Sequence, residues 1–125
     1  MNAVDSSAWL EYFANGPNAD FFADAIENIG DLLVPSICIY EVFKRVLQQR
    51  GEHEALQATA LMQQGEIVGL DPSLALEAAR LSLETGLPMA DSIVLATARS
   101  RQATLWTQDS DFEGMASVKF KGKKK

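Results

Sequence analysis

The sequence predicts an α/β domain in which a parallel sheet of four to five strands carries helices on both faces. Short apolar runs alternate with longer helical patterns along the chain, as expected when strand–helix units build a parallel sheet. The 125 residues suffice for one domain, and 47% of them are apolar, so the chain can bury a core without disulfides. Crossovers between parallel strands are right-handed, which places helices on both sides of the sheet.

Each predicted strand is a short, mostly apolar or β-branched run between two helical patterns. The last is expected to be an edge strand, and Pro35 closes the second. The predicted strands span Asn2–Val4, Leu32–Val34, Glu66–Leu70, Thr104–Thr107 and Val118–Phe120.

Helix boundaries follow from capping and helix-breaking residues. Asn15-Gly16-Pro17 breaks the first helix, Ser36 is expected to cap the third, and Gly51 ends it. Asp71-Pro72 begins a helix with proline in its first turn, and Gly86-Leu87-Pro88 ends that helix. The predicted helices span about Ser7–Ala14, Ala19–Asn28, Ser36–Arg50, Glu54–Gln64, Pro72–Gly86 and Ala90–Arg101.

Charge divides the chain into two parts. The net charge is −6, yet five of the eleven basic residues lie in the last seven positions. Residues 1–118 contain six basic and 17 acidic residues, a net charge of −11, and are expected to form one domain followed by a basic C-terminal tail, 119–125. A domain with such an excess of acidic residues is a poor nonspecific binder of nucleic acid. The lysine tail either contacts phosphates or is a frayed, solubilising terminus.

Composition excludes several classes of protein and site. The apolar runs are too short for a membrane helix, and no signal peptide is visible. The one cysteine, Cys38, lies in an apolar segment and indicates a buried thiol in the cytoplasm. With only one histidine, His53, zinc sites and Cys–His catalysis are very improbable, and no glycine-rich loop supports nucleotide binding.

If the strands are parallel, four carboxylates can open toward the end of the sheet where such sheets bind their ligands, beyond the carboxyl ends of the strands. Asp5 directly follows the first strand, and Asp109 comes two residues after the fourth. Glu41 lies one turn into the helix after the second strand, and Asp91 stands at the start of the last helix. Clustered carboxylates repel one another unless protons or cations neutralise them, and Mg²⁺ prefers oxygen ligands. The placement therefore predicts a divalent-cation site.

Each acid also has a purely structural interpretation. Asp5 and Asp91 are both suited to capping a helix N-terminus. Glu41 could pair with Arg45 at i, i+4, and Asp109 could be a turn residue. The case for a common site depends on the four acids occupying analogous positions in one short chain.

Four spaced motifs carry a family resemblance, and together they cover nearly the whole chain. They are Val4-Asp5-Ser6-Ser7-Ala8-Trp9, Val34-Pro35-Ser36 leading to Tyr40-Glu41-Val42, Leu87-Pro88-Met89-Ala90-Asp91-Ser92, and Leu105-Trp106-Thr107-Gln108-Asp109-Ser110-Asp111-Phe112. This set resembles the PIN-domain family, especially the VapC-type toxins of toxin–antitoxin pairs. The resemblance implies a three-layer α/β/α fold and an endoribonuclease that depends on Mg²⁺, with Mn²⁺ as an alternative.

The resemblance also assigns residues and partners. It places Asp5, Glu41, Asp91 and Asp109 in the family's acidic quartet. Asp111 matches a further acid near the site, while Ser6 and Thr107 match hydroxyl residues that line it; position 6 is often threonine in the family. It implies a homodimer and an antitoxin whose basic C-terminal segment enters the active-site groove.

The resulting hypothesis is a metal-dependent endoribonuclease, a hydrolase that cleaves RNA with a metal-activated water. Asp5, Asp91 and Asp109 are the expected metal ligands, and Lys44 and Arg45 are candidates to meet the RNA backbone. The alternative is a catalytically silent module whose acidic cleft holds a basic partner peptide. A third, weaker hypothesis is a phosphatase or phosphotransfer domain, although Asp5 lacks the second acid that such sites use.

Overall fold

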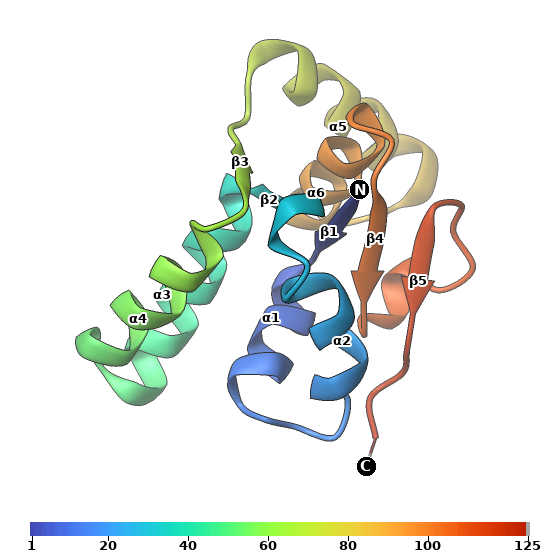
Figure 1. The fold of residues 1–125 in the computed structure, drawn as a ribbon. Coiled ribbons are helices and arrows are strands. Elements are labelled where there is room, and N and C mark those ends of the chain that lie inside the picture. Colours follow the sequence, from blue (N-terminus) through green and yellow to red (C-terminus); the bar gives the residue numbers. More distant parts are fainter. Residues whose placement is uncertain (125) are drawn as a thin grey trace.

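A computed structural model of the protein describes residues 1–124, which form one five-stranded parallel sheet with the order β3-β2-β1-β4-β5 (Figure 1). The strands are β1 (Asn2–Val4), β2 (Leu32–Pro35), β3 (Glu66–Val68), β4 (Thr104–Thr107) and β5 (Val118–Phe120). β1 lies at the centre and pairs with both β2 and β4, so the residues that follow these three strands meet at one edge of the sheet. The predicted three-layer α/β/α class is confirmed.

Helices connect the strands in three crossovers. They are α1 (Ser6–Phe13), α2 (Ala19–Ile26), α3 (Ser36–Arg50), α4 (Glu52–Met62), α5 (Pro72–Thr85) and α6 (Met89–Ser100), with 3₁₀ turns at η1 (Ile29–Asp31) and η2 (Ser110–Phe112). The chain crosses the sheet outward from β1 to β3 and then returns to β4. Because right-handed crossovers in opposite directions use opposite faces, the α5–α6 pair covers the face opposite α1–α4.

The core lies between these layers. Trp9, Phe22, Leu95, Leu105 and Phe112 are fully buried, and they come from both helical layers, from β4 and from η2. Cys38 is a free, buried thiol, as predicted, with its Sγ 3.8 Å from the Val4 carbonyl oxygen. Within residues 1–124, no helix combines the length and apolar character needed to cross a bilayer.

Several predicted boundaries are confirmed by cap geometry. Asp71 accepts a hydrogen bond from the Leu74 N–H and caps α5, with Pro72 at the first position. Gly86 ends α5 in the left-handed region, with φ 77°. Gly51, with φ 89°, joins α3 directly to α4. This tight joint starts α4 at Glu52 rather than at the predicted Glu54.

Two local predictions are wrong. The third strand ends at Val68 rather than Leu70, because Val68 pairs with Pro35, where β2 ends and offers no further partner. Ser36 does not cap α3: the cap position is held by extended Pro35, which has no side-chain cap bond, and Ser36 is already the first helical residue. Strand and helix therefore follow one another without a loop.

The predicted edge strand is present as β5, parallel to β4. It includes Lys119 and Phe120, so the expected tail begins inside the sheet. The Lys121 N–H extends the pairing by donating to the Thr107 carbonyl oxygen at 3.0 Å. Lys125, the last residue of the expected tail, lies outside the described residues.

Candidate metal centre and active site

Asp5 stands at the carboxyl end of the central strand. Its Oδ1 accepts hydrogen bonds from the Ala8 N–H at 3.0 Å and the Ser7 hydroxyl at 2.8 Å, so it caps α1. Its Oδ2 accepts from the Thr107 hydroxyl at 2.7 Å. The side chain is buried, and this burial raises the pKa of Asp5 to about 6 despite the three hydrogen bonds that lower it. The capping interpretation is thus correct, and the same cap holds the carboxylate at the strand ends.

Thr107 links Asp5 to the next acid. Its Oγ1 accepts a hydrogen bond from the Asp109 N–H at 2.9 Å while donating to Asp5. Asp109 in turn caps η2, its Oδ1 accepting from the Asp111 N–H at 2.9 Å. These hydrogen bonds set the directions in which the Asp109 and Asp111 side chains point.

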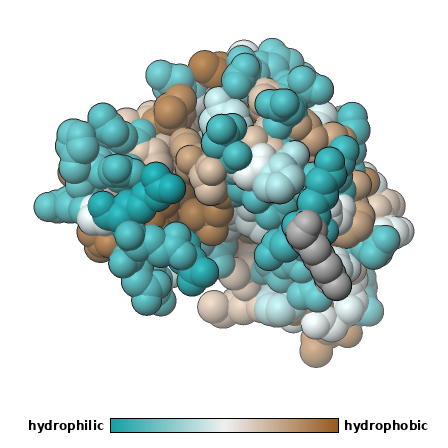
Figure 2. Space-filling view, turned by 90° about the horizontal axis from the view of Figure 1, so that it is seen from below, coloured by the Kyte–Doolittle hydropathy of each residue, from teal (hydrophilic) through white to brown (hydrophobic). Residues whose placement is uncertain are grey.

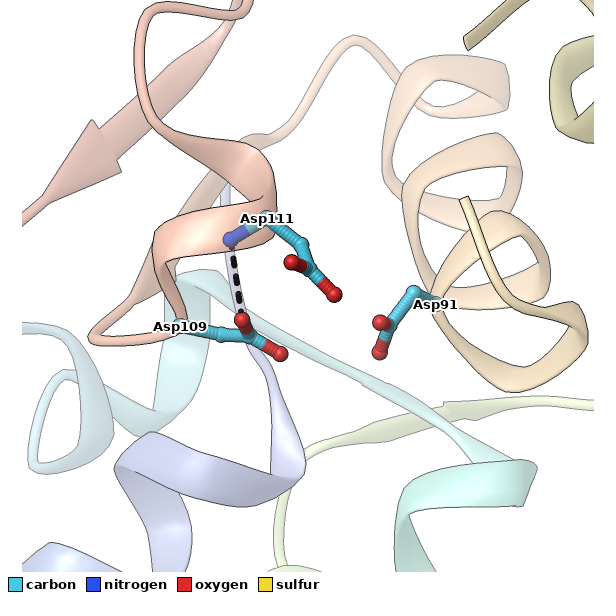
Figure 3. A group of neighbouring side chains, drawn as sticks. All are labelled: Asp91, Asp109 and Asp111. Atoms are coloured by element: carbon cyan, nitrogen blue, oxygen red, sulfur yellow. Dashed lines mark hydrogen bonds between the residues drawn. The ribbon is translucent and has the colours of Figure 1, made fainter. Parts of the chain in front are cut away.

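Asp91 approaches from the other side, as the third residue of α6. One oxygen each of Asp91, Asp109 and Asp111 lie within 4.8 Å of one another, and Figure 3 shows the three carboxylates facing a common space between α6 and η2. Desolvation and the charges of Asp109, Asp5, Glu41 and Asp111 raise the pKa of Asp91 to about 7. The cap of α6 falls at Pro88, so Asp91 is no helix cap.

Glu41 reaches the same region from α3. Its Oε1 accepts a hydrogen bond from the Ser6 hydroxyl at 2.7 Å, and its charge contributes to the raised pKa of Asp91. No Glu41–Arg45 ion pair forms among the described residues, which excludes the i, i+4 interpretation. Ser6 thereby positions the acid on α3 against the end of β1.

The acid cluster lacks a protein cation. None of the ion pairs within residues 1–124 involves Asp5, Glu41, Asp91, Asp109 or Asp111. Converging carboxylates that form no ion pair within the described residues are the donor set that a hard divalent cation prefers, and the pKa values of two of them, Asp5 and Asp91, are raised. Asp91, Asp109 and Asp111 are the residues that fit such an ion most directly, because their oxygens are close and Asp91 has no capping role.

Comparison with known proteins gives the family. A family model for the PIN domain matches residues 3–118. The chain belongs to the PIN domain family. A comparison with curated proteins gives no match.

Solved structures share the fold of this PIN domain. A toxin–antitoxin complex from Klebsiella pneumoniae contains a chain with TM-score 0.80 and 21% identity, covering 95% of this chain and 96% of that one. VapC20 of Mycobacterium tuberculosis, described as a sarcin–ricin loop cleaving toxin, has TM-score 0.77 and 15% identity, covering 93% and 95%. DNA-bound VapBC from Salmonella typhimurium has TM-score 0.74 and 14% identity, covering 98% of both chains.

A groove runs along α1 of the PIN domain, and of the five acids Glu41 lines it. It lies between α1 and the α3–α4 pair, with Ser6 and Glu41 in its wall, and Leu10 and Val46 among its apolar residues. Figure 2 shows apolar surface in a hollow beside the hydrophilic residues at the end of the α3–α4 pair. Arg45 lines this groove.

Lys44, the other residue predicted to contact the RNA backbone, lies outside the groove. Lys44 is exposed and lies over the Tyr40 ring, 5.7 Å from its centroid. It is not among the residues that line the groove. The two candidate RNA contacts therefore differ, and Arg45 is the better placed for a strand in the groove.

Sequence patterns missed two polar residues at the edge of the site. Asn18 and Gln108 are both buried, and the Asn18 Nδ2 donates to the Gln108 Oε1 at 3.2 Å. Gln108 directly follows Thr107 in the motif that runs from Leu105 to Phe112, so its position at a strand end was a usable signal. Asn18 precedes α2, ninety residues away in sequence, and no local pattern connects the two.

Proposed function

We propose that this PIN domain is a divalent-metal-dependent endoribonuclease and acts as the toxin of a type II toxin–antitoxin pair. The observation that carries the proposal is the convergence of five acids from four parts of the chain without any basic partner. Keeping such a group together costs electrostatic free energy, which a bound cation offsets. PIN-family membership supports nuclease chemistry at this location.

Each residue has a proposed task. Asp91, Asp109 and Asp111 would hold Mg²⁺ or Mn²⁺, with Asp5 completing the set. When bound, the metal would supply an activated water and neutralise charge on the scissile phosphate. Thr107 would hold Asp5 and Asp109 in register, and Ser6 would hold Glu41, which is placed to accept a proton or orient the water.

The direct test compares RNA cleavage by the parent chain, Asp5→Asn and Asp91→Asn in Mg²⁺ and in EDTA. Both variants should lose most activity, and EDTA should abolish it in the parent. Asp24→Asn is a matched control, because Asp24 is an exposed acid on α2 outside the cluster. Full activity in both site variants would refute the mechanism.

The toxin role is supported by the structural neighbours, which include a toxin–antitoxin complex and VapBC assemblies. The proposed antitoxin carries a basic C-terminal segment that binds the acid cluster and blocks the site. Expression of the chain alone should arrest growth, and co-expression with the product of an adjacent gene should relieve the arrest and co-purify. Growth arrest by Asp91→Asn equal to the parent's would contradict a nuclease toxin.

A cytoplasmic location accords with the free Cys38 thiol.

A homodimer is proposed from the apolar side chains that remain exposed. Leu76 and Leu83 lie seven residues apart on α5 and are 63% and 90% exposed, and Met89 at the start of α6 is 74% exposed. Exposed apolar residues that recur along one helix face are typical of an interface. Light scattering should give twice the chain mass for the parent and a monomer for Leu83→Lys.

The alternative function is a binding module that cuts nothing. The net charge of −11 over residues 1–118 favours it, because an acidic surface suits a basic partner. Binding of a basic peptide without metal-stimulated cleavage of any RNA would favour this alternative.

A further inference from the structure

The lysine tail is fixed in place as far as Gly122. The Asn18 Nδ2 donates to the Gly122 carbonyl oxygen at 2.9 Å as well as to Gln108, and the Lys121 N–H donates to the Thr107 carbonyl oxygen. Asn18 is buried and Gly122 is exposed, so this tether fastens the tail to a side chain of the interior. The backbone of the tail is therefore fastened to the strand end that carries the acidic site.

Aromatic rings hold the side chains of the first two lysines. The Lys119 Nζ lies 4.2 Å from the centroid of Trp106, and the Lys121 Nζ lies 5.1 Å from that of Phe21. Such cation–π contacts favour one orientation of each side chain. They leave Lys123 as the next lysine along the tail, just beyond the tether at Gly122.

Lys123 lines the groove between α1 and the α3–α4 pair. It shares this groove with Ser6 and Glu41 of the candidate site and with Arg45 on α3. No ion pair involves Lys123 among residues 1–124, although acids greatly outnumber bases in the body of the chain. The tether thus places Lys123, which forms no ion pair within residues 1–124, in the groove that Glu41 also lines.

We propose that Lys123 contacts a phosphate of the RNA strand in this groove and that the Asn18–Gly122 tether positions it to do so. The inference rests on the proposed function, because it names how the same site holds its substrate. A body with a net charge of −11 repels a polyanion, so a strand must gain local cationic contacts to approach the acids. Lys123 and Arg45 supply them within one groove. A basic peptide would meet like charge at both residues, which favours RNA over such a peptide as the ligand of Lys123.

The experiment measures binding separately from cleavage. The affinity of the full chain for a fluorescein-labelled single-stranded RNA is measured by anisotropy across a salt series, with Ca²⁺ replacing Mg²⁺. Lys123→Ala should weaken binding about 3–10-fold at low salt and reduce the slope of log K against log salt by about 0.7, the value for one phosphate contact on a single strand. Lys123→Arg should restore both quantities.

Arg80→Ala is the matched control. It removes one positive charge from α5, where Arg80 pairs with Glu77 outside the groove. Its affinity for RNA should stay close to that of the parent. An equal loss in Lys123→Ala and Arg80→Ala would overturn the proposal, because net charge alone would then account for the effect.

Asn18→Leu tests the tether while keeping every lysine. It removes both donated hydrogen bonds, and it should weaken RNA binding in the same direction as Lys123→Ala. Because Asn18 is buried, its variant is compared only if its circular dichroism matches the parent; Lys123→Ala, at an exposed position, decides the proposal in either case.

The outcomes separate this inference from the proposed function. RNA that binds through Lys123 but is not cut in Mg²⁺ would refute the nuclease and retain the lysine contact. Cleavage in Mg²⁺ with unchanged RNA affinity in Lys123→Ala would retain the nuclease and refute the lysine contact. Unchanged RNA affinity together with altered binding of a basic peptide in Lys123→Ala would also overturn the proposal.

Discussion

The Thr107 hydroxyl and the Asp5 carboxylate form a buried hydrogen bond of 2.7 Å that joins the ends of β4 and β1. These strands are neighbours in a parallel pair, with Val4 opposite Trp106, so the residues that follow each strand emerge side by side. The hydrogen bond fixes the Asp5 carboxylate and the Thr107 side chain relative to each other. The Thr107 Oγ1 also accepts a hydrogen bond from the Asp109 N–H, so one side chain positions two acids.

Thr107→Val tests this link because valine keeps the shape and removes the hydroxyl. It leaves the buried Asp5 carboxylate without one donor and the Asp109 N–H without an acceptor. We expect the free energy of unfolding to fall by about 1–3 kcal/mol and cleavage to fall roughly 10–100-fold. Denaturant unfolding and initial rates measure the two effects. Thr107→Ser retains the hydroxyl and should stay near the parent; a Thr107→Val protein with parental activity would contradict the assigned role.

The stability of the metal-free chain should depend on pH. The pKa values of Asp5 and Asp91 rise from 3.8 to about 6 and about 7 in the folded state. Between about pH 4 and about pH 7 the folded chain then binds more protons than the unfolded chain, so the free energy of unfolding falls as the pH rises. In EDTA, the melting temperature should fall across this window, and less steeply for Asp91→Asn. A melting temperature that rises with pH in EDTA would contradict the raised pKa values.

Added Mg²⁺ should reverse this trend in the parent. A cation binds the ionised carboxylates of the folded chain, and binding to the folded state alone stabilises it by mass action. We therefore expect millimolar Mg²⁺ to raise the melting temperature most at the upper end of the window, near the pKa of about 7 of Asp91. Asp91→Asn should show a much smaller increase, whereas Asp24→Asn should respond like the parent. A metal response that is equal in all three proteins would place the cation elsewhere.

The pH dependence of cleavage should shift with metal concentration. Metal and protons compete for the same carboxylates, so the rate should rise between about pH 6 and about pH 7 at low Mg²⁺, following the pKa values of Asp5 and Asp91. Higher Mg²⁺ should move the midpoint to lower pH. A midpoint that does not move with Mg²⁺ would show that another group controls the rate.

Gly65→Ala should destabilise the fold at the outer strand. A Cβ at Gly65 would lie 2.9 Å from the Val34 Cγ2 and 3.0 Å from the Leu32 carbonyl oxygen, so β3 would have to shift away from β2. We expect a loss of about 1–3 kcal/mol in the free energy of unfolding, measured by urea titration. Gly69→Ala is the control: a Cβ there has no neighbour within 4 Å, and its stability should match the parent or slightly exceed it. If Gly65→Ala and the parent had equal free energies of unfolding, β3 would shift without loss of stability and the prediction would be wrong.

Local patterns predicted most of the fold because its boundaries are set by local chemistry. Asp71 before Pro72 begins α5, and Gly86 ends it in a conformation that glycine adopts without strain. The errors occurred where a neighbour in space decided the boundary. Val68 ends β3 because its partner strand stops at Pro35, and nothing in residues 66–70 alone signals that limit.

The acids were found from their positions at strand ends and near helix starts, but their mutual arrangement was not. Asp111 was expected beside the site, yet its carboxylate lies with those of Asp91 and Asp109. The single turn of η2 between Asp109 and Asp111 brings this about, because it directs both side chains to α6. The tether from Asn18 to Gly122 was also beyond sequence patterns, since its ends are 104 residues apart.

The sequence by itself determined the order of strands and helices, the apolar core and the presence of acids at strand ends, because periodicity, capping and chain breaks act over a few residues. Only the tertiary structure decided which carboxylates share one space, which lacks a basic partner, and where the lysine tail lies. These are contacts between distant segments, and their free energies depend on burial and on distance, which the sequence does not contain.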